Sequence, residues 1–227
     1  MKARESAHLW LRERGIRFVF GNPGSTELPF LLGLEGAARY ILGLHEGVAV
    51  AMADGYAQAS GEVAFLNLHA APGLGNALGA LYTALKNRSP LVVTVGDQDR
   101  RHRFRAPLLS GPLVEMAKPV SKAAWEVSRA EDLPEALERA FHLALTPPRG
   151  PVVVAVPMDV WEEEAPPPPL KGPLPPDPPR ASRGWPRPSP RRKTPPWSWG
   201  PGPTPLRPAG PPSSWPSAWA PPFSPTP

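Results

Sequence analysis

The sequence predicts an α/β fold, a Rossmann-like three-layer domain with a mostly parallel sheet, followed by a disordered proline-rich tail. Over residues 1–165, short β-branched or aromatic runs alternate with apolar helical patterns of about 10–15 residues, which is the order of successive βαβ units. That alternation stops at residue 166, and 25 of the 37 prolines lie between there and residue 227. We therefore expect a folded domain over 1–165 and a disordered tail over 166–227, because such a composition buries too little apolar surface to order itself.

The first predicted elements are recognised by their periodicity and by the residues that end them. Ser6–Arg14 has apolar residues on one helical face and predicts an amphipathic helix. Arg17–Phe20 predicts a strand, which a Gly-Asn-Pro-Gly turn ends. Ser25 or Thr26 is then expected to cap a helix over Glu27–Leu34, since a hydroxyl oxygen can accept a hydrogen bond from a free backbone amide of the first turn.

The rest of the domain repeats the same alternation. Leu91–Val95 is a continuous apolar run, typical of a strand that is buried on both faces. The other predicted strands are 40–44, 63–68, 120–124 and 152–156, and the other predicted helices are 46–60, 74–86 and 131–145. Strands that alternate with helices in this way form right-handed crossovers and a parallel sheet.

Composition and charge exclude several classes of protein. The tail carries eight Lys and Arg against one acid, while the whole chain has a net charge of +5, so the domain itself is slightly acidic and offers no basic footprint for nucleic acid. The chain has no cysteine, which excludes disulfides, zinc–thiolate sites and thiol nucleophiles and fits a cytoplasmic enzyme. No apolar run reaches the roughly 18 residues of a membrane span, and charged residues interrupt the N-terminal apolar run, so we expect no membrane partner and no signal peptide.

Three polar residues follow three successive predicted strands: Ser25, Glu46 and His69. Because ligands bind at the carboxyl ends of the strands in such sheets, these residues are candidates for an active-site rim. Each has a structural alternative: Ser25 as a helix cap, Glu46 as an acid that complements a helix dipole, and His69 as a strand-end histidine without a chemical role. A buried carboxylate is costly unless a partner pairs with it, so Glu46 is the most informative of the three.

Other catalytic patterns are absent or incomplete in the sequence. Gly73-Leu74-Gly75 with Gly79 follows a predicted strand, but its spacing is one residue too long for the dinucleotide-binding fingerprint, so a tight turn with close helix packing is the alternative. The turn after the first strand lacks the Gly-Lys-Ser/Thr ending of a phosphate-binding loop, and there is no Gly-x-Ser-x-Gly elbow. No histidine pair flanks a glutamate with zinc-ligand spacing, and we assign no metal ligand.

Three motifs, taken in order, resemble the pyrimidine-binding (PYR) domain of thiamine-diphosphate-dependent enzymes. They are Gly21-Asn22-Pro23-Gly24-Ser25-Thr26-Glu27-Leu28, then His45-Glu46 with Ala53-Asp54-Gly55-Tyr56-Ala57, then Asn67-Leu68-His69 with Pro72-Gly73. The resemblance runs from about residue 3 to residue 164. Within the superfamily the sequence is similar to benzoylformate decarboxylase and its relatives, because acetolactate-synthase-like members usually lack a histidine at the position of His69.

The resemblance implies a cofactor, thiamine diphosphate, and a role for each candidate residue. Glu46 would contact a ring nitrogen of the cofactor's pyrimidine and drive the tautomerisation that lets the cofactor remove its own thiazolium C2 proton. Ser25 would bind the carboxylate of a small 2-keto acid substrate, and His69 would act as an acid or base, since imidazole titrates near neutrality. The expected contacts with the cofactor, besides Glu46, are Pro23, Gly24, Met52, Gly73, Leu74 and Asn76.

The resemblance also implies a part that these residues do not supply. In the family a separate PP domain binds the diphosphate and Mg²⁺ through a Gly-Asp-Gly motif with a downstream asparagine. Gly96-Asp97-Gln98 lacks the second glycine, so we expect the chain to lack the Mg²⁺ ligands and to be inactive alone. It would act in a homodimer or with a partner that supplies a PP domain. The open alternatives are an acetolactate-synthase-like carboligase fragment, or a non-catalytic dimerisation or interaction module.

The tail has two further interpretations. Pro173–Pro176 fits the P-x-x-P pattern of ligands of SH3-like domains. Five of the eight tryptophans lie in the tail with many Arg and Ser residues, a composition that also fits translation of a GC-rich gene in the wrong frame. On this hypothesis another forward frame past codon 165 encodes a central domain and then a Gly-Asp-Gly motif. Immediate stop codons in both other frames would contradict it.

Overall fold

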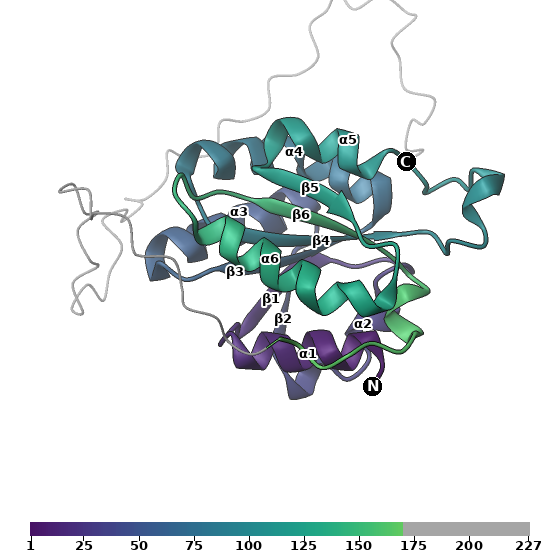
Figure 1. Cartoon of the computed structure of the whole chain (residues 1–227). Coiled ribbons are helices and arrows are strands. Elements are labelled where there is room, and N and C mark those ends of the chain that lie inside the picture. Colours follow the sequence, from purple (N-terminus) through teal and green to yellow (C-terminus); the bar gives the residue numbers. More distant parts are fainter. Residues whose placement is uncertain (170–227) are drawn as a thin grey trace, which may run out of the picture. The chain divides into compact units, whose positions relative to one another are not determined.

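A single parallel sheet organises the part of the chain that the structure describes. The computed structural model describes residues 1–169, so the predicted disordered tail lies, from residue 170 on, outside the described residues. The six strands lie in the order β2-β1-β3-β4-β6-β5, and each neighbouring pair runs parallel (Figure 1). The predicted α/β fold with a mostly parallel sheet is therefore confirmed.

Strands and helices alternate along the chain as expected. The strands are β1 (Phe18–Asn22), β2 (Arg39–Leu42), β3 (Ala64–Leu68), β4 (Leu91–Asp97), β5 (Ala123–Glu126) and β6 (Val152–Pro157). The helices are α1 (Ala3–Glu13), α2 (Leu28–Leu31), α3 (Glu46–Ser60), α4 (Ala70–Asn87), α5 (Leu113–Ala117) and α6 (Leu133–Leu145). Within residues 1–169, no helix is long and apolar enough to cross a membrane.

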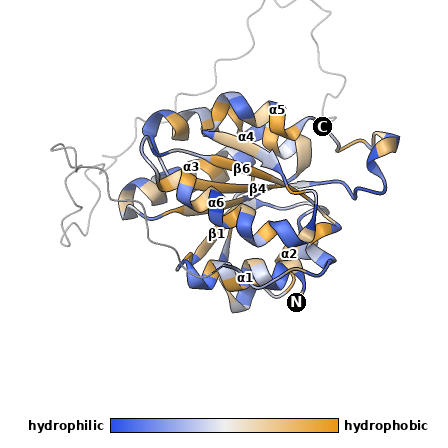
Figure 2. Ribbon diagram, in the orientation of Figure 1, coloured by the Kyte–Doolittle hydropathy of each residue, from blue (hydrophilic) through white to orange (hydrophobic). Residues whose placement is uncertain are grey.

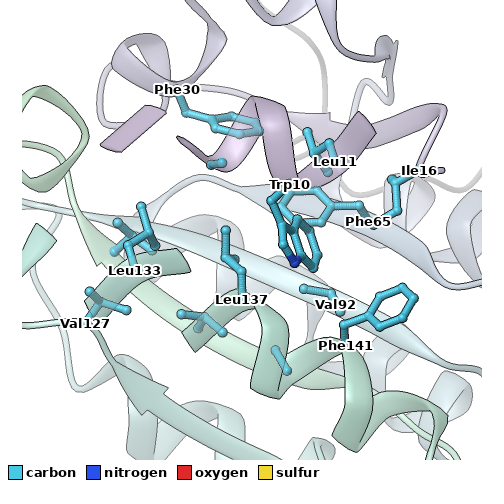
Figure 3. Packing of buried hydrophobic residues seen from close by; sticks show 14 of the residues in the cluster. Trp10, Leu11, Ile16, Phe30, Phe65, Val92, Val127, Leu133, Leu137 and Phe141 are labelled. Atoms are coloured by element: carbon cyan, nitrogen blue, oxygen red, sulfur yellow. The ribbon is translucent and has the colours of Figure 1, made fainter. Parts of the chain in front are cut away.

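Helices cover both faces of the sheet and enclose an apolar layer on each. On the face covered by α1 and α6, Trp10 is fully buried, and its ring centroid lies 6.1 Å from that of Phe65 and 5.9 Å from that of Phe141 (Figure 3). The helices α3, α4 and α5 cover the opposite face. Figure 2 shows β4 and β6 as hydrophobic strands between these layers, and every residue of both strands is buried, as the continuous apolar runs predict.

The helix expected over Glu27–Leu34 is present but shorter than predicted. Its helical part, α2, covers only Leu28–Leu31, and Gly33 follows with a φ of 82°, a left-handed conformation that glycine adopts readily and that ends the helical segment. No side-chain hydrogen bond caps α2, so neither Ser25 nor Thr26 is its cap. The polar residues that follow β1 therefore have contacts other than helix capping.

Two other boundaries also differ from expectation. The helix α4 begins at Ala70 rather than Leu74, so the turn predicted at Gly73-Leu74-Gly75 is wrong. Pro72 is tolerated in the first turn of α4, because a backbone N–H at that position would have no partner within the helix. The strand expected over 120–124 begins at Ala123 instead, since the residues before it form α5 and a 3-10 turn.

The strand order creates a switch point between β1 and β3. After β1 the chain crosses to β2 on one side of it, and after β2 the chain returns to β3 on the other side. In open α/β sheets the ligand crevice lies outside the carboxyl ends of the strands at such a point. The segments that carry Ser25, Glu46 and His69 follow these three adjacent strands, as predicted.

Candidate functional site

Glu46 is the first residue of α3 and is 5% exposed. Its Oε1 accepts a hydrogen bond from Nδ2 of Asn22 at 3.3 Å, and its Oε2 accepts one from Nδ2 of Asn76 at 3.0 Å. Asn22 ends β1 and Asn76 lies in α4, so two other elements hold the carboxylate in place. Amide donors satisfy the carboxylate without adding a positive charge, which leaves its charge, or a shared proton, available to a ligand. Complementing a helix dipole would require none of these partners.

Gly73 provides space between Glu46 and His69. A Cβ atom on Gly73 would lie 2.9 Å from Oε1 of Glu46 and 3.2 Å from Cβ of His69, so a larger residue would crowd both side chains. Gly73 lies within α4 and not in a loop between elements. Its lack of a side chain therefore serves close packing at the site. Met52, another expected cofactor contact, lies further along α3. Its side chain is partly buried against the apolar layer between the sheet and the helices α3, α4 and α5.

His69 immediately precedes α4 and pairs with a carboxylate that sequence reasoning missed. Its Nδ1 lies 2.8 Å from Oε2 of Glu27, whose side chain is fully buried, and 3.1 Å from Oγ1 of Thr26. Glu27 also accepts hydrogen bonds from the backbone amide of Gly24 at 2.8 Å and from Oγ1 of Thr26 at 2.5 Å. The sequence alone suggests that Glu27 starts a helix. The signal for a different role is its position just after a glycine turn at the carboxyl end of a strand.

The pairing with Glu27 determines which nitrogen of His69 can react. With the Nδ1–H donated to the carboxylate, Nε2 is the nitrogen left to exchange a proton with a ligand. The His69 side chain is 21% exposed, so part of it is accessible. The next residue, Ala70, is buried and has a φ of 45°, a left-handed conformation that costs a non-glycine residue about 1–2 kcal/mol. Such strain concentrates at functional sites, and here it lies at the strand-to-helix junction that carries His69.

The other predicted site residues lie at different depths. Ser25 is exposed on the turn after β1, and Pro23 and Gly24 are partly exposed beside it. A Cβ atom on Gly24 would lie 2.3 Å from the ring of His69, so this turn packs directly on the imidazole. The prediction that Leu74 faces the cleft from a turn is wrong. Its side chain is fully buried in the apolar layer between α4 and the sheet, which leaves no free surface for a ligand.

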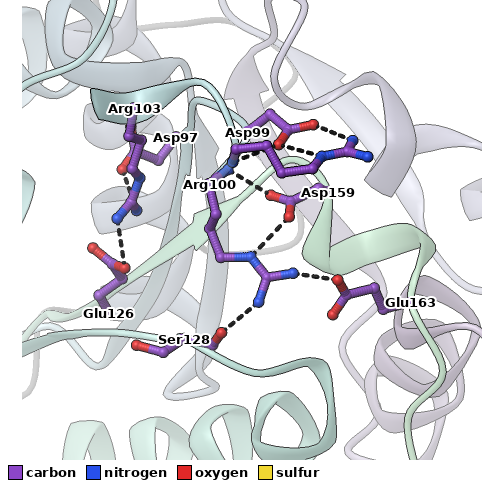
Figure 4. Close-up of polar contacts among 9 residues, drawn as sticks. Asp97, Asp99, Arg100, Arg103, Glu126, Ser128, Asp159 and Glu163 are labelled. Carbon is purple, nitrogen blue, oxygen red and sulfur yellow. Dashed lines mark hydrogen bonds and ion pairs between the residues drawn. The ribbon is translucent and has the colours of Figure 1, made fainter. Parts of the chain in front are cut away.

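The carboxyl ends of β4 and β6 carry a different set of polar contacts (Figure 4). Arg100, in the segment after β4, donates from Nε to Oδ2 of Asp159 at 2.7 Å and from its backbone amide to Oδ1 of the same residue at 3.1 Å. Its other guanidinium nitrogens donate to the carboxylate of Glu163 and to the carbonyl oxygen of Ser128. One arginine thus fastens the segment after β4 to the segments after β5 and β6.

Arg103 makes a second bridge in the same region. Its guanidinium donates to Oδ2 of Asp97 at 2.6 Å and to Oε1 of Glu126 at 2.8 Å. Burial raises the pKa of the Asp97 carboxyl, although hydrogen bonding from the Gln98 amide and the charge of Arg103 oppose that shift. Burial outweighs them because Asp97 is only 3% exposed.

The cavity beside these ion pairs is not the predicted site. It has a volume of about 660 Å³, and Arg100 and Asp159 are among the residues that line it, whereas Glu46 and His69 are not. Across the described range 1–169, no cluster of three or more His, Asp or Glu side chains is placed to hold a metal ion.

Comparison with known proteins relates this domain to an enzyme family. The family described as thiamine pyrophosphate enzyme, N-terminal TPP binding domain, matches residues 1–110. The benzoylformate decarboxylase of Pseudomonas aeruginosa is 50% identical over 157 residues, which are 69% of this chain and 30% of that protein. The acetolactate synthase large subunit of Haemophilus influenzae is 35% identical over 151 residues, which are 66% of this chain and 26% of that protein.

Solved structures show the same relation. The thiamine diphosphate-dependent 4-hydroxybenzoylformate decarboxylase of Rhodococcus jostii has a TM-score of 0.71 at 48% identity, over 74% of this chain and 32% of that one. Benzoylformate decarboxylase from Polynucleobacter necessarius has a TM-score of 0.70 at 40% identity, over 73% of this chain and 31% of that one. The chain therefore spans only about 30% of the length of the decarboxylases that it matches.

These matches define the class of protein. The chain is similar to the N-terminal, TPP-binding domain of thiamine pyrophosphate enzymes. Within that class it is similar to the benzoylformate decarboxylases, with acetolactate synthases as further relatives. The resemblance inferred from the three motifs is confirmed.

Proposed function

We propose that the chain is the pyrimidine-binding part of a thiamine-diphosphate-dependent 2-keto-acid decarboxylase similar to benzoylformate decarboxylase. The observation that carries this proposal is Glu46, a buried carboxylate whose two oxygens are held by neutral amides at the switch point of the sheet. These residues fit the aminopyrimidine of thiamine diphosphate. A carboxyl group held by neutral donors can share a proton with a ring nitrogen, and Gly73 leaves space beside it.

The polar residues of the crevice would divide the work between them. When bound, the cofactor supplies the electron sink for decarboxylation. Glu46 would share a proton with a ring nitrogen of the pyrimidine, while Asn22 and Asn76 keep both of its oxygens in place. His69 would exchange a proton with the substrate at Nε2, while Glu27 holds the ring with Nδ1 protonated.

The rest of the site would be completed by the exposed turn and by a second domain. Ser25 would donate a hydrogen bond to the carboxylate of a small 2-keto acid, and Pro23 and Gly24 would contact the pyrimidine side of the cofactor. A PP domain, within a homodimer or from another partner, would bind the diphosphate and Mg²⁺, as the resemblance implies. The absence of cysteine from the sequence fits a cytoplasmic location for such an enzyme.

Exposed apolar side chains beside Glu46 support an association of this kind. Leu44 is 89% exposed and Val48 is 52% exposed, and both lie within two residues of Glu46 in the sequence. Contiguous exposed apolar patches mark interaction surfaces, and we propose that Leu44 and Val48 belong to one. We expect the purified chain to form dimers or larger assemblies. Light scattering that detects only monomers at high micromolar concentration would count against this part of the proposal.

An acetolactate-synthase-like carboligase is the second candidate, supported by the relative that is 35% identical. The pair of His69 and Glu27 favours the decarboxylase, since acetolactate-synthase-like members usually lack a histidine there. Product analysis with pyruvate and with benzoylformate, on an assembled enzyme, separates the two. Failure to bind the cofactor in any assembly would instead favour a non-catalytic dimerisation module.

A chimera tests the proposal. Residues 1–165 replace the matching N-terminal segment of the Pseudomonas aeruginosa benzoylformate decarboxylase, and turnover of benzoylformate is then measured. We expect no turnover by the chain alone, because its sequence holds no Gly-Asp-Gly motif of the kind that the resemblance implies for diphosphate and Mg²⁺. We expect turnover by the chimera, because the rest of the relative supplies them. A chimera that folds and assembles but does not turn over would contradict the proposal.

A further inference from the structure

Two buried polar atoms near Glu27 have no hydrogen-bond partner among the protein atoms that the structure describes: the hydroxyl of Tyr40 and Oδ1 of Asn67. Tyr40 lies on β2, and Asn67 lies on β3 and is 1% exposed. A buried polar group that stays unpaired costs about 1–3 kcal/mol, so folded proteins satisfy nearly all such groups with protein atoms or ordered water. One of these atoms is a donor and the other an acceptor, which a single water molecule can bridge.

The two atoms lie on the same face of the sheet, over Gly21. Asn67 is paired in register with Gly21, which lies on the strand between β2 and β3. A Cβ atom on Gly21 would lie 2.2 Å from the Tyr40 hydroxyl, so the tyrosine extends across the place where a larger side chain would be. The lack of a side chain at Gly21 thus brings the phenol of β2 towards the amide of β3.

The side chain of Glu27 reaches the face of the sheet that carries Tyr40 and Asn67, nearer the carboxyl ends of the strands. Asn67 is paired in register with Thr94 and donates from Nδ2 to its Oγ1 at 3.1 Å. Gly96, two residues further along β4, also faces this side, and a Cβ atom there would lie 1.8 Å from Oε1 of Glu27. Burial, and then the charges of Glu27 and Glu46, raise the pKa of the Tyr40 phenol, so Tyr40 keeps its proton at neutral pH and acts as a donor.

We propose that a single buried water molecule binds between Tyr40, Asn67 and Glu27, and that Tyr40 is thereby a positioning residue for His69. The Tyr40 hydroxyl donates to the water, which donates one proton to Oδ1 of Asn67 and the other to a carboxylate oxygen of Glu27. Three polar partners suffice to hold a buried water. The water fixes the carboxylate that in turn holds Nδ1 of His69. The importance of His69 rests on the proposed function, whereas the water site itself does not.

The sign of a stability change tests the water site. Tyr40→Phe keeps the ring and removes only the hydroxyl. If the variant loses the bound water, Oδ1 of Asn67 and the carboxylate of Glu27 each lose a donor, and the Tm of the full chain should fall by about 2–4 °C. If the hydroxyl were truly unpaired, its removal would relieve a cost and the Tm would stay the same or rise, which would overturn the proposal. Tyr82→Phe is the matched control. Tyr82 is 50% exposed, so the Tm of this variant should equal that of the parent chain.

Two further measurements separate a positioning role from a purely structural one. A crystal structure of the chain at high resolution should show a water bonded to the three groups, and Tyr40→Phe should lose it. The nitrogen-15 shifts of His69 should report the Nδ1–H tautomer in the parent chain and a mixture of tautomers in Tyr40→Phe. An unchanged tautomer would overturn the positioning role even if the Tm falls. Neither readout needs cofactor or turnover, so both remain valid if the decarboxylase proposal fails.

Discussion

The carboxyl edge of the sheet holds two groups of buried or partly buried carboxylates that are paired in different ways. After β1 and β2, Glu27 and Glu46 are held by amides, a hydroxyl and His69, and we call them the amide-held group. At the ends of β4 and β6, Asp97 and Asp159 are held by arginine side chains, and we call them the arginine-held group. Both groups lie at or just after the carboxyl ends of parallel strands of one sheet, so the fold alone does not distinguish them.

The difference in partners indicates that one group is suited to chemistry and the other to holding segments of the chain in place. A guanidinium stays charged at every working pH, so it neutralises a carboxylate permanently and fixes its geometry. Neutral donors fix the geometry equally well but leave the charge, or a shared proton, to a ligand. The amide-held group is therefore suited to proton transfer, and the arginine-held group is suited to fastening the segment after β4.

The largest effect is expected when Glu46 of the amide-held group is compared, in the chimera, with Glu126, a carboxylate that Arg103 pairs with beside the arginine-held group. Glu46→Gln should lower turnover of benzoylformate by about 10²–10⁴-fold, because an amide cannot share a proton as a carboxyl group does. Glu126→Gln, which changes the same type of side chain beside Arg103, should keep turnover within a few-fold of the parent. Steady-state kinetics on both variants measure the contrast. Equal losses in the two variants would abolish the distinction between the groups.

The next largest effect concerns stability, and here the loss is expected in the arginine-held group. Arg100→Ala in the full chain should lower the free energy of unfolding by about 1–3 kcal/mol, because it leaves Asp159 without its charged partner and weakens the attachment of the segment after β4. Arg101→Ala is the control. Arg101 is 82% exposed, and within residues 1–169 its side chain pairs only with Asp99, so the change should stay within about 0.5 kcal/mol. Urea unfolding measures both. A smaller loss for Arg100 than for Arg101 would refute the anchoring role.

The pH dependence of stability sharpens the account of the arginine-held group. Because burial raises the pKa of Asp97 above its ordinary 3.8, the folded chain takes up a proton at a higher pH than the unfolded chain does. The parent should therefore gain free energy of unfolding relative to Asp97→Asn as the pH falls from neutrality, and the gain should level off near 3.8. Urea unfolding at a series of pH values measures the difference between the two chains. A difference that shrinks on acidification would contradict the raised pKa.

The smallest effect is expected at the strained residue beside His69. Ala70→Gly releases a left-handed conformation, and we expect it to raise the free energy of unfolding by up to about 1 kcal/mol. Ala71→Gly, one residue further into α4, should lower it by about 0.5–1 kcal/mol, because glycine weakens a helix that carries no strain there. Thermal unfolding of the two variants compares them. Losses of similar size in both would show that Ala70 is not strained.

The sequence predicts the order of the elements and the site residue Glu46 better than it predicts which residues contact the site residues. Alternating periods are local, so strand and helix order follow from short windows, and Glu46 belongs to a contiguous motif. Its partner Asn22 ends β1, and the partner of His69 lies 42 residues before it, so the first contact depends on how β1 packs beside β2 and the second on how β1 packs beside β3. Arg100 and Asp159 are 59 residues apart and lie in segments without a regular period, which is why the arginine-held group escapes sequence reasoning.

The exchange of the thiazolium C2 proton of thiamine diphosphate for deuterium tests the central claim most directly, because it depends on Glu46 and needs no substrate. The parent chimera and its variants are mixed with the cofactor in deuterium oxide, quenched in acid and followed by proton NMR. We predict exchange that is slower by at least about 10²-fold in Glu46→Gln and unchanged in Glu126→Gln. Exchange at the parent rate in Glu46→Gln would contradict the assignment of Glu46 and the functional division of the sheet edge.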